Sequence, residues 1–237
     1  MARHMRSRAP SRSADPFNGT GVAAQPFVEL DERQASRNEV VNARLATSIM
    51  TDASTSDSHD IAGSVVRALV LYSLAEFQSG HSTTIRVNAE ARSFSIEDNG
   101  RGHAIERTVA GSPYLQFVYT HLDYPFVPAQ GAPIQMQGIG LSLINALCCE
   151  LTVTARKQDA TLRMSFRGGS LRDQELLKVR SKGTGNTISG AVDSQFQKYD
   201  LDTQLLQGWV LGVLAASPSL ELYLNGQELH TLSNRDA

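Results

Sequence analysis

The feature that most constrains the fold is a helix that is apolar on two sides. Residues 61–78 place apolar side chains at helical spacing in two separate stripes. One stripe runs through Val65 and Leu69, and the other runs through Val66 and Val70. A helix with two apolar faces is buried between the layers of a domain rather than lying on its surface. The sequence therefore predicts a layered fold that encloses this helix.

The residues at both ends of this helix are suited to begin and end it. Asp60 or Ser58 is placed to cap the N-terminus with a side-chain oxygen. Gly80, in Ser79-Gly80-His81, is placed to end the helix in a left-handed conformation.

The rest of the ordered pattern alternates between hairpins and helices. Alternation of apolar and polar residues predicts strands over 83–89, 92–98, 151–157, 160–168 and 187–192. Helices are predicted around 112–121, over 138–151 and over 200–216, the last with Asp200 as its cap. Asn225-Gly226 predicts a hairpin turn within 220–229. Because hairpins join most strands, we expect an α+β sandwich with a mainly antiparallel sheet and helices on one face.

Two segments are predicted to lie outside this regular structure. Residues 1–27 are rich in Arg and Ser and have little to bury, which predicts a disordered basic tail. A nucleic-acid or targeting role is the alternative for this tail. Residues 28–237 are expected to form one domain, and its stretch 122–137 is a loop longer than a simple connection needs.

Composition excludes several classes of protein. The 237 residues carry 22 Lys and Arg against 24 Asp and Glu, which is too balanced for a basic module that coats nucleic acid. No apolar run approaches the roughly 20 residues that cross a bilayer, so no membrane association is expected. The two cysteines, Cys148 and Cys149, are adjacent in a predicted helix and fit a reducing, cytoplasmic compartment.

The first of two glycine motifs is Asp98-Asn99-Gly100-Arg101-Gly102, directly after a predicted strand. Glycines let the backbone approach a flat ligand closely. A carboxylate at the strand end can accept a hydrogen bond from an exocyclic amine. Taken alone, the motif is more typical of a tight turn after an edge strand.

The second glycine motif is Gln137-Gly138-Ile139-Gly140, at the start of a predicted helix. Free backbone N–H groups and the helix dipole favour phosphate oxygens at such a start. A flexible hinge before the helix is the alternative. The order of helix, two strands, first motif, long loop, second motif and hairpin is more specific than either motif alone.

In this order and spacing the chain resembles the GHKL ATPases, which have the Bergerat fold and include gyrase B, the corresponding subunit of topoisomerase IV and histidine kinases. The gyrase B type fits best. The resemblance covers roughly residues 40–230 and is carried by QSGH, IEDNGRG, QGIGLSLINALCCEL and the region that begins with KGTG. It implies a two-layer sandwich that binds ATP or ADP.

The resemblance also implies roles for individual residues. Asp98 matches the acid that recognises adenine, and Arg101 matches the Arg over the adenine, with Glu76 as its carboxylate partner. The positions that match nucleotide-binding residues of the family are Glu76, Asp98, Gly100, Arg101, Gly102, Gly138, Ile139, Gly140 and either Asn186 or Thr187.

Two positions depart from the family pattern. Ala68 stands where the family has its catalytic Glu, and Tyr72 stands where it has a magnesium-binding Asn. Alanine cannot activate water, and tyrosine is a poor magnesium ligand. The resemblance with these departures implies a degenerate module that binds nucleotide or a partner, has no catalytic residue and has no magnesium site.

The alternative is that the chain is the ATP-hydrolysing portion of a type II DNA topoisomerase. Both interpretations imply a partner, either a topoisomerase subunit or a second copy of this chain. Any contact with DNA would be indirect, because we recognise neither a transducer domain nor a DNA-cleavage domain in the sequence.

Overall fold

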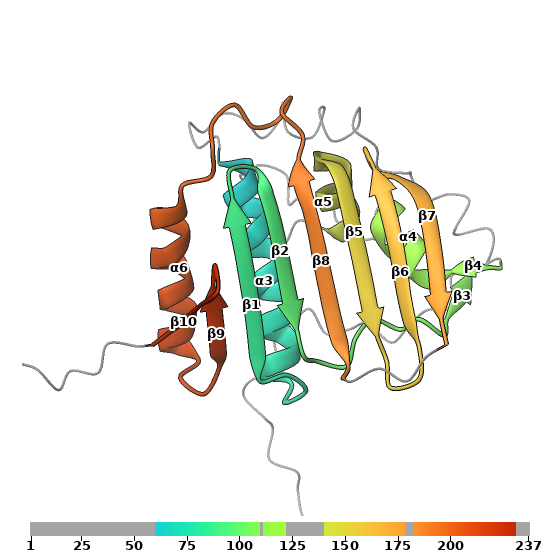
Figure 1. Ribbon diagram of the computed structural model, residues 1–237, viewed down its shortest axis with the longest axis horizontal. Coiled ribbons are helices and arrows are strands. Elements are labelled where there is room, and N and C mark those ends of the chain that lie inside the picture. Colours follow the sequence, from blue (N-terminus) through green and yellow to red (C-terminus); the bar gives the residue numbers. More distant parts are fainter. Residues whose placement is uncertain (1–59, 110, 122–139, 179–182, 231–237) are drawn as a thin grey trace, which may run out of the picture. The chain divides into compact units, whose positions relative to one another are not determined.

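The computed structural model describes residues 60–109, 111–121, 140–178 and 183–230. An eight-stranded sheet forms one layer, with strand order β10-β9-β1-β2-β8-β5-β6-β7 (Figure 1). Helices α3, α4 and α5 lie behind this sheet in the view of Figure 1. The predicted tail (1–27) and long loop (122–137) lie outside the described residues.

The described helices are α3 (Ile61–Gln78), α4 (Tyr114–Thr120), α5 (Leu141–Leu147) and α6 (Thr203–Ala216). The strands of the large sheet are β1 (Thr84–Glu90), β2 (Ser93–Asp98), β5 (Cys148–Arg156), β6 (Thr161–Arg167), β7 (Ser170–Leu177), β8 (Gly185–Val192), β9 (Glu221–Leu224) and β10 (Gln227–Leu229). A separate two-stranded ladder contains β3 (Thr108–Val109) and β4 (Ser112–Pro113). Neighbours in the large sheet are antiparallel except β1 and β9, so the predicted α+β sandwich with a mainly antiparallel sheet is confirmed.

Helix α3 is buried against the sheet, behind β1 and β2 in the view of Figure 1, as its two apolar stripes predict. The carboxylate of Asp60 accepts a 2.8 Å hydrogen bond from the backbone N–H of Gly63, which caps the helix. The chain leaves the helix through Gly80 at φ 75°. Among the described helices α3 alone has the length and apolar composition of a membrane span, but it packs against β1, β2 and β8, with Val65 and Leu69 fully buried.

The boundary between α5 and β5 differs from the prediction. The sequence predicts one helix over 138–151, but α5 ends at Leu147 and Cys148 begins β5, paired with Val192. Cys148 and Cys149 are therefore strand residues, not helix residues. The cause is the uninterrupted apolar run through this region, because such a run fits a buried strand as well as a helix. Residues 138 and 139 lie outside the described part of the chain.

Two smaller differences concern β7 and α6. Strand β7 was not predicted, because it is an edge strand whose side chains are almost all exposed and do not alternate. Helix α6 is capped by Asp202, whose carboxylate accepts from the N–H groups of Gln204 and Leu205, and not by Asp200. The predicted turn at Asn225-Gly226 is confirmed, with φ of 49° and 80°.

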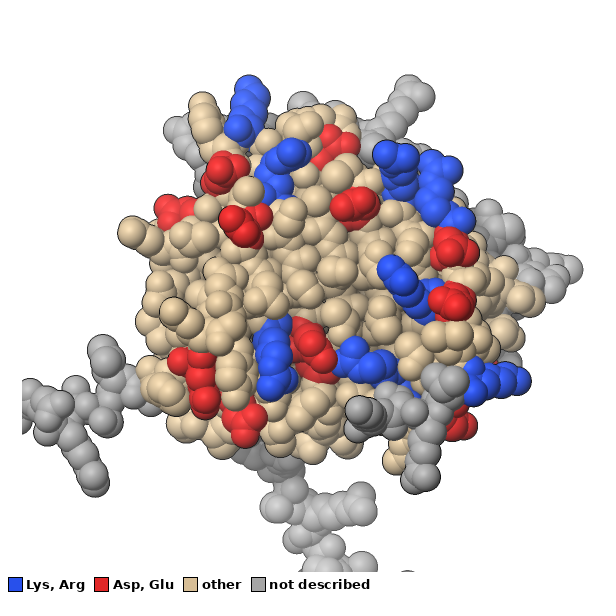
Figure 2. Space-filling model, viewed as in Figure 1, with Lys and Arg blue, Asp and Glu red and all other residues tan. Residues whose placement is uncertain are grey.

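The face of the sheet away from α3 is polar and carries small side chains at its centre. Ser95, Ser189, Thr152 and Ser165 stand opposite one another on four neighbouring strands. Figure 2 shows that charged side chains gather toward the margins of this face. The opposite face holds the core. Successive residues along β2 and β8 point alternately to the core side and to the polar side, so residues two apart share a side.

Candidate functional site

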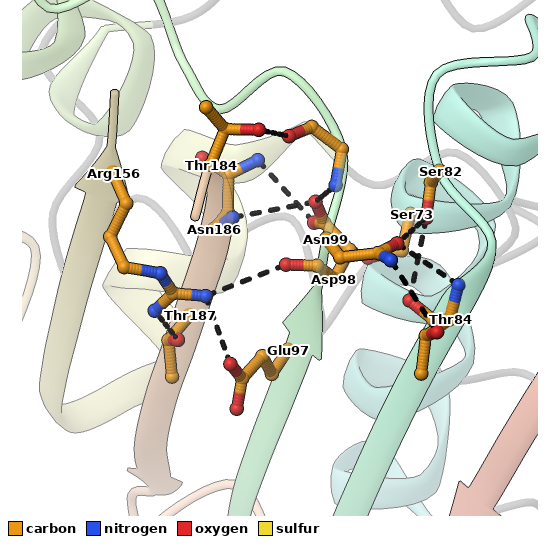
Figure 3. Close-up of polar contacts among 11 residues, drawn as sticks. Ser73, Ser82, Thr84, Glu97, Asp98, Asn99, Arg156, Thr184, Asn186 and Thr187 are labelled. Carbon is orange, nitrogen blue, oxygen red and sulfur yellow. Dashed lines mark hydrogen bonds and ion pairs between the residues drawn. The ribbon is translucent and has the colours of Figure 1, made fainter. Parts of the chain in front are cut away.

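Asp98 is the last residue of β2 and is 4% exposed. It follows Phe94 and Ile96 on the core side of the strand, which directs its carboxylate toward the helical layer. Its Oδ1 accepts from the backbone N–H of Gly100 at 2.9 Å. Its Oδ2 accepts from the hydroxyl of Ser73 on α3 at 3.2 Å (Figure 3). Burial raises the pKa of Asp98, and these hydrogen bonds oppose the rise because they favour the ionised form.

Asn186 on β8 completes the surroundings of Asp98. Its backbone N–H donates to Oδ1 and its side-chain Nδ2 donates to Oδ2, both at 3.4 Å. Thr187, the other candidate at this position, points to the polar face of the sheet. There its hydroxyl accepts a 2.6 Å hydrogen bond from Arg156, which also pairs with Glu97 at 2.9 Å. The structure therefore brings Asn186, and not Thr187, to Asp98.

The loop after β2 is held in place by residues at the start of β8 and at the end of β5. Thr184 donates to the carbonyl oxygen of Gly100 at 2.6 Å, and Lys157 donates to the carbonyls of Arg101 and Gly102 at 2.9 and 3.0 Å. A Cβ atom on Gly102, which has φ 72°, would lie 2.5 Å from the carbonyl oxygen of Arg156. At this position glycine is required by the protein's own backbone, and not only by a ligand.

Glu76 and Arg101, which belongs to this loop, form a bidentate ion pair. Arg101 Nη2 lies 2.8 Å from Glu76 Oε1, and its Nε lies 3.1 Å from Oε2. The backbone N–H of Arg101 also donates to Oε2 at 3.2 Å. The hydrogen bonds from Arg101 lower the pKa of Glu76. The side chains of Glu76 and Asp98 both lie close to Gly100, so the predicted acid, cation and partner are brought together in one place.

The two departures from the family motif lie on α3. Ala68 is 2% exposed and belongs to the core, whereas Tyr72 is 43% exposed. Gly140 precedes α5 as its N-cap, with φ −60° and ψ 148°. In the described ranges, 60–109, 111–121, 140–178 and 183–230, no three His, Cys, Asp or Glu side chains gather as metal ligands would. The chemistry available is thus hydrogen bonding by a buried carboxylate beside an exposed guanidinium plane.

The sequence did not single out two groups at this site. Ser73 belongs to the second apolar stripe of α3 but donates to Asp98. The other group is His103, which donates its backbone N–H to Asn186 Oδ1 at 2.8 Å, and whose Nε2 lies 3.2 Å from the hydroxyl of Tyr119. The place of His103 directly after the glycine motif is the one signal in the sequence that could have pointed to it.

We expect the buried position of His103 to make the free energy of unfolding depend on pH. Burial lowers the pKa of His103 to about 4, against 6.5 for the free side chain. Below pH 6.5 the unfolded chain therefore binds a proton on this ring, whereas the native state does so only as the pH approaches 4. The free energy of unfolding therefore decreases as the pH falls from 6.5 to 4. We expect this loss to be about 2 kcal/mol, below the full linkage value because the ring is partly exposed.

Urea unfolding at several pH values measures this loss. His103→Gln, which keeps a hydrogen-bonding side chain, should remove most of the difference between pH 7 and pH 4 that the wild type shows. His81→Gln, at an exposed position, is the matched control and should not. Equal pH dependence in His103→Gln and the wild type would contradict the assignment.

Comparison with solved structures identifies the fold. The chain is similar to the 43K ATPase domain of Thermus thermophilus gyrase B, solved in complex with an aminocoumarin, with a TM-score of 0.58 and 20% sequence identity. The similarity covers 70% of this chain and 45% of that one. The chain therefore shares the α+β fold of that domain, a mainly antiparallel sheet with helices on one face.

Comparison with curated proteins finds relatives in sequence. The chain is 29% identical to the B-type subunit of DNA topoisomerase 4 from Staphylococcus epidermidis over 123 residues, which is 50% of this chain and 18% of that one. It is 29% identical to DNA gyrase B of Campylobacter jejuni over 143 residues and 27% identical to that of Haloferax volcanii over 176 residues. In sequence, the chain is thus similar to the B subunits of DNA topoisomerase 4 and DNA gyrase.

The extent of these similarities is limited. The two gyrase matches cover 56% and 69% of this chain, and 18% and 27% of the relatives. No model of a known protein family matches the chain.

Proposed function

We propose that this chain is a cytoplasmic, gyrase B-like domain that binds adenine nucleotides, ATP or ADP, without hydrolysing them. It would act as a nucleotide-binding or interaction module for a topoisomerase subunit or a second copy of itself. The observation that carries the proposal is the buried carboxylate of Asp98 beside Gly100 and the Glu76–Arg101 ion pair. A buried carboxylate that accepts hydrogen bonds at a strand end is suited to an exocyclic amine.

The proposed loss of hydrolysis rests on α3. A general base must reach the attacking water, and the side chain of Ala68 has no proton acceptor. Tyr72 offers a phenol where a magnesium ion would need a carboxylate, carbonyl or amide oxygen. Phosphate binding would then depend on Gly138, Ile139 and Gly140 and on the start of α5, without a metal ion to neutralise the phosphates.

A second candidate function follows from the sequence relatives. They are subunits of DNA topoisomerase 4 and DNA gyrase by name, and the alternative is that the chain is the ATPase portion of a type II DNA topoisomerase. The two functions differ in one observable, the release of phosphate from ATP.

Asp98→Asn tests the adenine site with little change in shape. We expect this variant to bind ADP at least about tenfold more weakly than the wild type, because an amide nitrogen replaces one carboxylate oxygen and a charge-assisted hydrogen bond is lost. Isothermal titration calorimetry with ADP measures the difference.

Asp159→Asn, at an exposed turn, is the control and should bind ADP as the wild type does. Equal ADP affinity in Asp98→Asn and the wild type, with both proteins folded by circular dichroism, would exclude adenine recognition by Asp98.

A further inference from the structure

Four donors of the protein itself surround the carboxylate of Asp98. The backbone N–H groups of Gly100 and Asn186 reach Oδ1 at 2.9 and 3.4 Å. The Ser73 hydroxyl and the Asn186 side chain reach Oδ2 at 3.2 and 3.4 Å. An ionised carboxylate offers about four lone-pair positions, so each is already used. A base amine that binds Asp98 must therefore replace one of these donors.

The four donors differ in how easily they can leave. Those of Gly100 and Asn186 that reach Oδ1 are backbone groups, fixed by the loop and by the pairing of β8. The side-chain amide of Asn186 is held at its other end, where its Oδ1 accepts from the backbone N–H of His103 at 2.8 Å.

The Ser73 hydroxyl is restrained far less. It turns about a single bond, and a serine inside a helix can direct its hydroxyl to the carbonyl oxygen four residues earlier, here that of Leu69. Ser73 is therefore the donor that a ligand can displace without moving the backbone.

We propose that Ser73 sets how strongly this site selects a base with an exocyclic amine. This rests on the proposed adenine-nucleotide function and deepens it. In the free protein the Ser73 hydroxyl holds the position on Oδ2 that the amine takes, and it rotates away when the amine binds. Each bound amine thus replaces an existing hydrogen bond, which weakens the preference for adenine.

The geometry separates adenine from hypoxanthine as probes. Adenine presents an amine to Oδ2, whereas hypoxanthine presents at the same ring position a carbonyl oxygen, which cannot donate to the carboxylate. Removal of the Ser73 hydroxyl leaves Oδ2 with one unused position, which the amine of adenine can fill and the carbonyl oxygen of hypoxanthine cannot. The selectivity for adenine then rises, while the phosphate contacts, which are common to both nucleotides, stay the same.

Titration of Ser73→Ala with ADP and with inosine diphosphate, without magnesium and at mildly alkaline pH, tests this proposal. We expect the ratio of the two dissociation constants to favour ADP about fivefold more than in the wild type, the scale of the net contribution of one typical hydrogen bond. Ser73→Thr keeps the hydroxyl and should retain the wild-type ratio. Ser79→Ala removes a hydroxyl from the end of the same helix and is the control.

An unchanged or smaller preference for ADP in Ser73→Ala would overturn the role of Ser73. If the wild type nevertheless binds ADP and Asp98→Asn does not, the proposed adenine site stands, and only the role of Ser73 is excluded. If neither the wild type nor Ser73→Ala binds ADP at millimolar concentration, both the proposed function and this inference fail. Circular dichroism and urea unfolding of each variant establish that it is folded.

Discussion

Purified protein incubated with ATP and magnesium is expected to release phosphate at the background rate. A positioned general base contributes roughly 10²- to 10⁴-fold to a rate, and the side chain of Ala68 has no acceptor for a proton. Ala68 is moreover 2% exposed, packed in the core under the sheet. A coupled phosphate-release assay with a long incubation measures the rate.

The control for this assay is the Asp98→Asn variant. Because the wild type should not turn ATP over, the two proteins should give the same trace. Magnesium-dependent phosphate release by the wild type that disappears in Asp98→Asn would show a working ATPase and would favour the topoisomerase alternative.

Gly185→Ala is expected to destabilise the fold by about 3 kcal/mol or more. Gly185 has φ 130°, a backbone conformation that side chains rarely adopt, and a Cβ atom there would overlap the backbone carbonyl oxygen of Asp98. This close approach joins the start of β8 to the end of β2, so neither strand can move without disturbing the site. The free energy of unfolding, from urea denaturation, measures the loss.

Gly212→Ala is the matched control for this substitution. Gly212 lies inside α6, and a Cβ atom there would meet nothing within 4 Å. Alanine is favoured over glycine in helices, so this variant should be more stable than the wild type by about 0.5–1 kcal/mol. Equal effects of the two substitutions would contradict the packing of β8 against the end of β2.

The elements that could be predicted are those with a strong local signal. The two apolar stripes of 61–78 and the turn at Asn225-Gly226 are such signals, and both elements lie where the sequence predicts. The end of α5 had no such signal, because Leu147 and Cys148 continue one apolar run into β5. Only the pairing of β5 with β8, distant in sequence, decides where the helix stops.

The site shows the same division between local and distant information. The glycine motif identifies Asp98 from neighbouring residues alone. The choice between Asn186 and Thr187 depends on the register of β8, in which Thr187 stands opposite Glu97 on the polar face. The contact of Ser73 with Asp98 joins positions 25 residues apart, and no local pattern in the sequence reports it.

Titration calorimetry with ADP and with a non-hydrolysable ATP analogue, each with and without magnesium, tests the central claim most directly. In the proposed function the adenine end of the site has its acid, Asp98, and its cation, Arg101, whereas Ala68 and Tyr72 occupy the two positions on α3 that would serve hydrolysis and the metal ion. We therefore predict dissociation constants of about 0.1–1 mM for both nucleotides, nearly independent of magnesium. A tenfold preference for the ATP analogue that requires magnesium would contradict the account.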